Sequence, residues 1–265
     1  MTPRAAVFCM HDVVPEARRV GMPVGHRPYA IAPEEFRALL MAAAELQRRT
    51  VPAGQLPQEL GGGFWCLTFD DGAESDYTEV FPVLRELGMR ATFFVVPTLV
   101  GTPGHVSWGQ LRELVAAGME VGSHSLTHPF MHALDAAGLR REFGESKRMI
   151  EDRLGCAVRS GSLPRGWEPP RYAEVLAELG YRVFCTSRVG WWRPGTAPLA
   201  VPRIAVRRGF RPEVFAALAA GEARVLFGMQ ATDRLKSLVK RCVGLRGWQG
   251  LRQPLLALGE RFSWR

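Results

Sequence analysis

Short apolar runs alternate with helix-like segments along most of the chain, and this alternation restricts the fold more than any other feature. The runs at 5–10, 64–69 and 91–96 have the composition of buried strands. Between such runs, segments such as 34–48 and 139–154 carry apolar residues at helical spacing. Alternating strands and helices form parallel sheets with helical crossovers, and 265 residues suffice for one such domain. We therefore expect an α/β fold built on parallel strands.

Polar residues follow several of the predicted strands at the point where each strand ends. They are His11, the pair Asp70 and Asp71, His124, and Pro164 with Arg165. In parallel α/β folds, ligands bind at the carboxyl ends of the strands. The sequence thus predicts a single site that gathers these side chains.

Asp70 and Asp71 are adjacent carboxylates at the end of the strand-like run 64–69. Side chains alternate along a strand, but at its frayed end both carboxylates can turn toward one site. Like charges this close raise one pKa unless a cation or a proton lies between them. The alternative is an ordinary turn, since Asp-Gly, here Asp71 and Gly72, is a common turn sequence.

His124 and His128 are separated by four positions after another predicted strand. If the segment continues as a helix, both imidazoles share one face, which is how paired histidines bind a divalent ion. A carboxylate as third ligand would leave a position open for water and substrate, as in catalytic sites. The alternative is that these histidines face solvent or cap a helix.

Three segments of the chain resemble the polysaccharide deacetylases, the NodB-homology or carbohydrate esterase family 4. They are 68–72, 91–94 and 124–128, and the resemblance extends over about residues 5–206. It implies a distorted (β/α) barrel that removes N-acetyl groups from amino sugars. By the same resemblance Asp71, His124 and His128 bind the metal, usually Zn²⁺ or another divalent ion such as Co²⁺. Asp70 is then the general base.

The third motif of that family, commonly Arg-x-Pro-Tyr-Gly, is altered here. Ser162 stands in place of the Arg that normally holds the base, and Arg165 in place of the Tyr. We nominate Arg203 as the replacement, against the alternative of a surface Arg. Pro164, Arg165 and Gly166, together with Arg203, are the predicted substrate-site residues. The backbone N–H of Arg165 would help to hold the developing oxyanion, unless its loop simply faces solvent.

The general acid also departs from the family pattern, because no histidine follows His132. The stretch 10–13 after the first strand resembles a circularly permuted subgroup that deacetylates bacterial exopolysaccharides. We therefore expect His11 to protonate the leaving amine or to stabilise the tetrahedral intermediate. The alternative is a hydrogen-bonded histidine at a strand end. Trp191 and Trp192, in an apparent loop, are candidates for contact with substrate.

The C-terminal segment carries the excess charge. Residues 203–265 contain thirteen Lys and Arg against four Asp and Glu, so the segment accounts for the net charge of +8. We predict a barrel domain over 1–206 and a basic helical extension over 207–265, with two helices within 224–258, that packs on the barrel or on an anionic membrane surface. Without a nucleic-acid-binding motif, we expect no nucleic-acid partner.

Five scattered cysteines without CxxC spacing argue against a disulfide framework. The N-terminal apolar stretch is too short for the core of a signal peptide, and no run reaches the roughly 18 apolar residues of a membrane span. These features favour a cytoplasmic protein with peripheral contact at the inner membrane.

The sequence therefore predicts a metal-dependent deacetylase. Its expected partner is an N-acetylated saccharide of a bacterial glycan or a lipid-linked precursor. Two alternatives remain open: a deformylase on a lipid-linked formamido sugar, which would use the same ligands, and a non-catalytic glycan-binding barrel.

Overall fold

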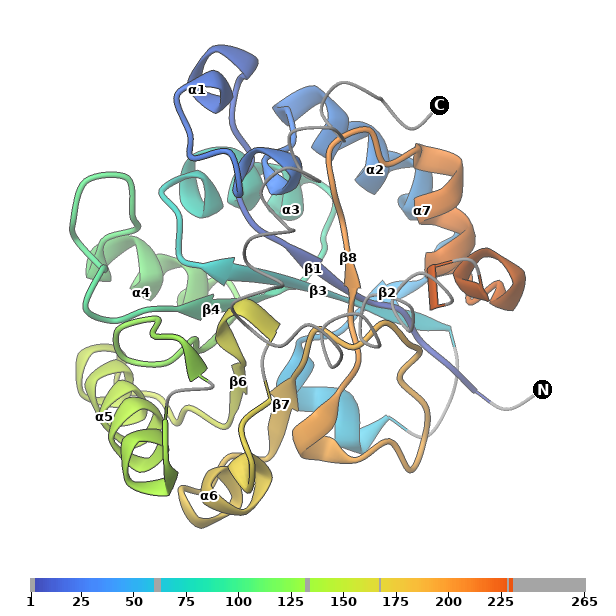
Figure 1. Ribbon diagram of the computed structural model, residues 1–265. Coiled ribbons are helices and arrows are strands. Elements are labelled where there is room, and N and C mark those ends of the chain that lie inside the picture. Colours follow the sequence, from blue (N-terminus) through green and yellow to red (C-terminus); the bar gives the residue numbers. More distant parts are fainter. Residues whose placement is uncertain (1–2, 60–62, 132–133, 167, 228, 231–265) are drawn as a thin grey trace.

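In the computed structural model, eight strands form one sheet in which every strand pairing is parallel (Figure 1). The structure describes residues 3–59, 63–131, 134–166, 168–227 and 229–230. The strand order is β7-β6-β5-β4-β3-β1-β8, and β2 pairs with β3. The strands are β1 Val7–Met10, β2 Arg49–Thr50, β3 Phe64–Asp71, β4 Thr92–Val95, β5 Glu120–Ser123, β6 Ser160–Ser162, β7 Val183–Cys185 and β8 Ile204–Ala205.

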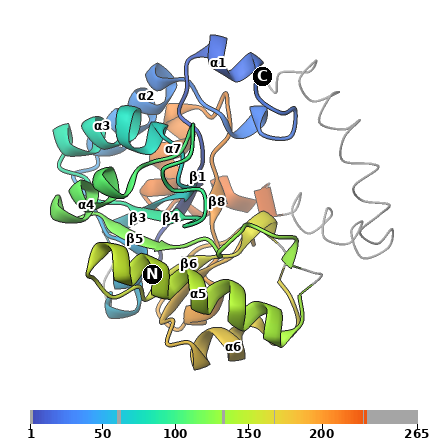
Figure 2. The same ribbon diagram turned by 90° about the vertical axis from the view of Figure 1, so that its left-hand side faces the viewer.

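Helices cover the outer face of the sheet, as Figures 1 and 2 show. They are α2 Pro33–Ala44, α3 Phe81–Glu86, α4 Trp108–Ala116, α5 Ala136–Leu154, α6 Tyr172–Glu178 and α7 Pro212–Ala219. The short α1 Glu16–Val20 buries none of its residues. A π-helical turn, Asp76–Val80, precedes α3. The expected alternation of strands and helices is therefore present, and its parallel pairing follows from the helical crossovers.

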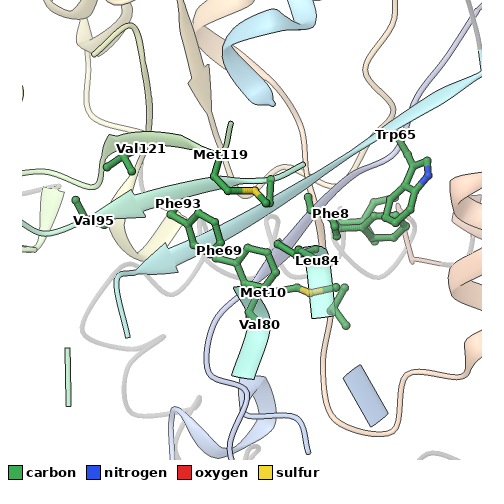
Figure 3. Close-up of a cluster of buried hydrophobic side chains, with 14 of the residues drawn as sticks. Phe8, Met10, Trp65, Phe69, Val80, Leu84, Phe93, Val95, Met119 and Val121 are labelled. Carbon is green, nitrogen blue, oxygen red and sulfur yellow. The ribbon is translucent and has the colours of Figure 1, made fainter. Parts of the chain in front are cut away.

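Strand alternation sorts the buried side chains into two clusters. On β3, Trp65, Leu67 and Phe69 join the large cluster under the helices, part of which Figure 3 shows. Phe64 and Cys66, on the other face, pack with side chains of β1 and β7. Because β1 and β7 are distant in the strand order, this second cluster shows that the sheet curls into a distorted half-barrel. The α/β prediction is confirmed.

The first strand lies between strands that come much later in the chain. β1 pairs with β3 on one side and with β8 on the other. The first strand is thus an interior strand of the sheet. His11, which follows β1, lies at the same edge of the sheet as the carboxyl ends of β3 and β5.

The predicted C-terminal extension is described only in its first part. α7 lies against α2, and Phe215 of α7 stacks on Phe8 of β1 with ring centroids 4.0 Å apart. The two basic helices predicted within 224–258 fall almost entirely outside the described residues, so the division at 206 stays a prediction. Within the described residues, no helix combines the length and the apolar character that a membrane span requires.

Candidate metal centre

The end of β3 presents two carboxylates toward the inside of the half-barrel. Thr68 and Asp70 occupy inner-face positions by strand alternation. Asp71 would follow on the outer face, but it adopts φ 80° and its carboxylate instead lies beside His124 and His128. Gly72 continues the turn at φ 73°, where a Cβ would come within 3.1 Å of a Val95 methyl carbon.

The segment that joins the two histidines is a loop, so the predicted helical continuation is wrong. Ser125 and His128 both adopt positive φ, at 66° and 56°. The Ser123 hydroxyl accepts from the Ser125 N–H at 3.3 Å, and the Ser125 hydroxyl accepts from the His128 N–H at 3.0 Å. These hydrogen bonds from backbone N–H groups to side-chain hydroxyls stabilise a turn here in place of a helix. The two rings nevertheless meet, with centroids 5.1 Å apart.

Asp71, His124 and His128 present one ligand atom each to a common point. The Oδ1 of Asp71 lies 3.4 Å from Nε2 of His124 and 3.4 Å from Nε2 of His128. Ligand atoms of a tetrahedral zinc site, each about 2.0–2.2 Å from the ion, are roughly 3.3–3.5 Å apart. One carboxylate oxygen and two imidazole nitrogens also match the donor set of catalytic zinc sites. The three residues therefore fit a divalent ion.

Arg203 holds Asp70 beside this ligand set, with Oδ2 of Asp70 3.9 Å from Nε2 of His124. The guanidinium donates two hydrogen bonds to the carboxylate of Asp70, at 2.7 Å and 2.8 Å, and both side chains are almost fully buried. It also donates to the Thr186 carbonyl and to the Thr68 hydroxyl. Arg203 thus contacts Asp70 as the nominated replacement for the missing motif Arg would, and it does so away from solvent.

The buried charges determine the protonation states of the site. Burial raises the pKa of Asp70, but Arg203 and His124 outweigh it and lower the pKa to about 2. Burial likewise opposes ionisation of Asp71, whose pKa the neighbouring histidines nevertheless hold well below its usual range. Burial lowers the pKa of His128 to about 4, and the charge of His124 acts in the same direction. Both carboxylates are therefore ionised at neutral pH, and the imidazole of His128 is neutral.

His11 lies next to Asp70, and its charge also acts on the carboxylate of Asp71. A ring nitrogen of His11, a carboxylate oxygen of Asp70 and the Cys9 sulfur all lie within 4.8 Å of one another. The Nδ1 of His11 is buried and has no hydrogen-bond partner among the described residues. The ring of Tyr29 packs against the His11 imidazole, with ring centroids 5.1 Å apart. The guanidinium of Arg207 donates a hydrogen bond to the Tyr29 hydroxyl at 3.2 Å.

Pro164, Arg165 and Gly166 form a short 3₁₀ turn after β6. Arg165 adopts φ 59°, its side chain is exposed, and its guanidinium lies 4.1 Å from the centroid of the Phe130 ring. The charge of Arg165 also contributes to lowering the pKa of His128, after burial and the charge of His124. The altered third motif thus borders the candidate metal centre on the His128 side.

Trp191 and Trp192 are not part of this rim. They are 8% and 4% exposed, and Trp192 packs against Phe64 with ring centroids 5.4 Å apart. The backbone of Trp192 also pairs with that of Ala5. The interpretation that these two side chains touch substrate is wrong, because both are covered.

Glu142, which the sequence analysis did not single out, anchors the loop between the two histidines. Its carboxylate accepts from the N–H groups of Leu126 and Thr127, each at 3.0 Å, and from the Thr127 hydroxyl at 2.9 Å. Glu142 is 5% exposed and lies on the buried face of α5. The sequence does contain a signal for Glu142, because it is a charged residue among the apolar positions of the predicted helix 139–154.

We expect Glu142→Gln to lower the free energy of unfolding by about 1.5–3 kcal/mol, because a neutral amide replaces a carboxylate that accepts three hydrogen bonds. The affinity for Zn²⁺ should fall with it, since the loop that carries His128 is loosened. Denaturant unfolding and chelator competition measure the two effects. Glu145→Gln, on the same helix, is the matched control. Equal losses of stability and of zinc affinity in Glu142→Gln and Glu145→Gln would contradict the role of Glu142 in anchoring the loop.

Asp76 is a buried carboxyl group close to the site. Neither of its oxygens has a hydrogen-bond partner among the described residues, and the residue is 1% exposed. Burial, reinforced by the charges of Asp12, Asp71 and Asp70, raises its pKa well above the usual value. The neutral form therefore stabilises the fold below the unfolded-state pKa of about 3.9, and this stabilisation is lost as the pH rises toward the raised value.

We expect Asp76→Asn to stabilise the metal-free protein at pH 7, by about 1.4 kcal/mol for each unit by which the folded-state pKa is raised. The gain should vanish near pH 4, where wild-type Asp76 is already largely neutral. Urea unfolding at both pH values measures it, with Glu79→Gln as the control. A gain that is independent of pH would refute the neutral state of Asp76.

Residues 58–184 match the model of the polysaccharide deacetylase family. The chain is 37% identical to a chitooligosaccharide deacetylase of Sinorhizobium fredii over 135 residues, which are 49% of this chain and 60% of that protein. It is 28% identical to the peptidoglycan-N-acetylglucosamine deacetylase PgdA of Listeria monocytogenes over 58% of this chain and 33% of that protein. The chain spans about half to three-fifths of the length of the first curated relatives it matches.

The solved structures that share the fold include the following two. The deacetylase PplD of Streptococcus pyogenes superposes with a TM-score of 0.72 at 20% identity, over 80% of this chain and 96% of that chain. IcaB of Ammonifex degensii superposes with a TM-score of 0.68 at 30% identity, over 82% of this chain and 96% of that chain. Since the similarity to IcaB extends over nearly all of that chain, and the family model matches the segment that carries both site motifs, this protein belongs to the polysaccharide deacetylase family.

Proposed function

We propose that this protein is a metal-dependent hydrolase that removes N-acetyl groups from an amino sugar of a bacterial glycan or of a lipid-linked saccharide precursor. One observation carries the proposal. A ligand set of Asp71, His124 and His128 lies directly beside a second carboxylate, Asp70, that is held by Arg203 and is not part of the set. Relatives that are named as a chitooligosaccharide deacetylase and a peptidoglycan-N-acetylglucosamine deacetylase support the substrate class.

In this proposal Asp71, His124 and His128 hold a divalent ion, Zn²⁺ by the chemistry of the donor set. When bound, such an ion polarises the amide carbonyl and lowers the pKa of water toward about 7. Asp70 is the general base. Arg203 keeps it ionised, which is the state in which a base must begin, and fixes both of its oxygens. The proton that water gives up is transferred to the Asp70 carboxylate as the new C–O bond forms.

The C–N bond of the amide breaks in the second half of the reaction, and the amine must gain a proton as it leaves. In this proposal His11 donates that proton, and the position of its ring next to Asp70 supports the role. Tyr29, packed against the imidazole, restricts its orientation. Pro164, Arg165 and Gly166 border the site at the His128 loop and would contact the saccharide there.

The basic C-terminal segment belongs to the same proposal. Its excess of Lys and Arg in 203–265 suits an anionic membrane surface, where a lipid-linked precursor would be presented. Binding of the full chain to vesicles that contain anionic lipid, compared with neutral vesicles, tests this part separately from catalysis.

Product analysis with the zinc-loaded full chain tests the activity. N-acetylated chitooligosaccharides are the first substrates to use, since a relative is named for them. We expect acetate release that depends on the metal and disappears in Asp71→Asn. Release of formate from formamido sugars, with no acetate, would favour a deformylase. Bound zinc with release of neither acid would favour a non-catalytic glycan-binding barrel and would refute the hydrolase.

A further inference from the structure

Ser162 lies between the candidate metal ligands and Asp70, although a hydroxyl there has no counterpart in the usual third motif. It is the last residue of β6 and is fully buried. Its Oγ lies 2.6 Å from Nδ1 of His124 and 3.2 Å from Oδ1 of Asp70. Its carbonyl oxygen lies 3.2 Å from the same Nδ1 of His124.

The chemistry of these groups fixes where the hydrogens lie. A carbonyl and an ionised carboxylate only accept hydrogen bonds. The Ser162 hydroxyl therefore donates to Asp70, and its lone pairs remain for His124. Since both oxygens of Ser162 that surround Nδ1 act as acceptors, Nδ1 of His124 carries the hydrogen. In the neutral ring, the form that binds a metal ion, the lone pair of His124 is then on Nε2, the atom that lies 3.4 Å from Asp71.

We propose that Ser162 is a positioning residue that selects the metal-binding tautomer of His124 and ties this ligand to Asp70. The inference rests on the proposed function, because it gives Ser162 a part in that same site. It also accounts for the altered motif. Arg203 already donates to both oxygens of Asp70 from the start of β8, so position 162 need not supply a guanidinium and carries a small hydroxyl.

Removal of the Ser162 hydroxyl is expected mainly to weaken metal binding. Partners that hold the second ring nitrogen of a ligating histidine fix its tautomer and orientation, and their removal typically weakens metal binding about 10–100-fold. Ser162→Ala keeps the backbone carbonyl but loses the hydroxyl, which is the nearer acceptor. We therefore expect Zn²⁺ affinity to fall by about tenfold or more.

Ser160 provides a matched control on the same strand. It is also fully buried, and its hydroxyl donates to the Glu120 carboxylate at 2.8 Å, away from the histidines. Ser160→Ala thus removes an equivalent buried hydrogen bond without touching the site. Ser162→Thr keeps the hydroxyl at position 162 and tests whether the hydroxyl itself matters.

The experiment is chelator competition for Zn²⁺ with the four full-length proteins, supported by the visible absorption spectrum after loading with Co²⁺. We expect weaker metal binding and an altered cobalt spectrum in Ser162→Ala only, with Ser162→Thr close to wild type. Should Ser162→Ala fail to fold, Ser162→Gly removes the same hydroxyl. Zinc affinity within twofold of wild type in the variant that lacks the hydroxyl, or an equal loss in Ser160→Ala, would overturn the assignment.

Measurement of acetate release separates the role of Ser162 from the proposed hydrolase activity. If wild type binds zinc, Ser162→Ala binds it weakly and neither releases acetate from any N-acetyl sugar, the role of Ser162 stands and the proposed hydrolase does not. If wild type releases acetate and Ser162→Ala matches it in both zinc affinity and rate, the hydrolase stands and the role of Ser162 does not.

Discussion

Replacing Asp70 by Asn is expected to lower kcat for acetate release by about 10²–10⁴-fold while the protein still binds one metal ion. A positioned general base contributes about this factor, and an amide cannot accept the proton. Metal binding should survive because the ligand atoms come from Asp71, His124 and His128. Single-turnover acetate release and metal analysis of the same preparation measure the two effects.

Asp71→Asn is the matched control, since it makes the same replacement of one carboxylate oxygen by an NH2 group at the neighbouring residue. We expect this variant to lose both the metal and the activity, because Asp71 lies 3.4 Å from both imidazole nitrogens. The division of labour between the two carboxylates would be refuted if Asp70→Asn released its metal as readily as Asp71→Asn, or if its kcat stayed within a few-fold of wild type.

Arg203→Met is expected to lower the free energy of unfolding by about 3–5 kcal/mol at pH 7, the usual effect of removing one partner from a buried ion pair. The methionine fills much of the space but leaves Asp70 charged and uncompensated. In wild type the pair stabilises the fold above the unfolded-state pKa of about 3.9, and this stabilisation is lost as the pH falls toward the folded-state pKa of about 2. The difference between the two proteins should therefore narrow below pH 4.

An exposed ion pair of the same chain provides the comparison. Arg37 bonds to Glu86 with both side chains about half exposed, at 43% and 53%, so Arg37→Met should change the stability far less than Arg203→Met does. Adding Asp70→Asn to Arg203→Met should restore part of the lost stability, because the buried charge is removed. A loss in Arg203→Met no larger than in Arg37→Met would show that the buried pair does not hold the site together.

The parallel sheet and the gathering of polar groups could be predicted because both depend on local pattern. Apolar runs ending in His11, Asp70 or His124 mark strand ends, and parallel strands present these ends at one edge. Arg203 could be nominated as well, because the resemblance implies an Arg that holds the base, the third motif lacks it, and Arg203 lies near a late predicted strand end.

Other parts of the site depend on contacts that no local pattern reveals. The four-residue spacing of His124 and His128 suggests a helix, but the loop is held by Glu142, which lies well beyond it in sequence. Ser162 reaches both His124 and Asp70 only because β6 ends beside them in the curled sheet. Tyr29 meets His11 through the long connection between β1 and α2, which has no regular pattern.

Anomalous diffraction at the zinc edge, from crystals of the zinc-loaded protein, tests the central claim most directly. We predict a single strong peak about 2.0–2.2 Å from an oxygen of Asp71 and from Nε2 of His124 and His128, with Asp70 outside the coordination sphere. A zinc ion held instead by Cys9, His11 and Asp70, whose ligand atoms also lie within 4.8 Å of one another, would contradict the assignment of base and ligands. So would the absence of any peak between the two histidines.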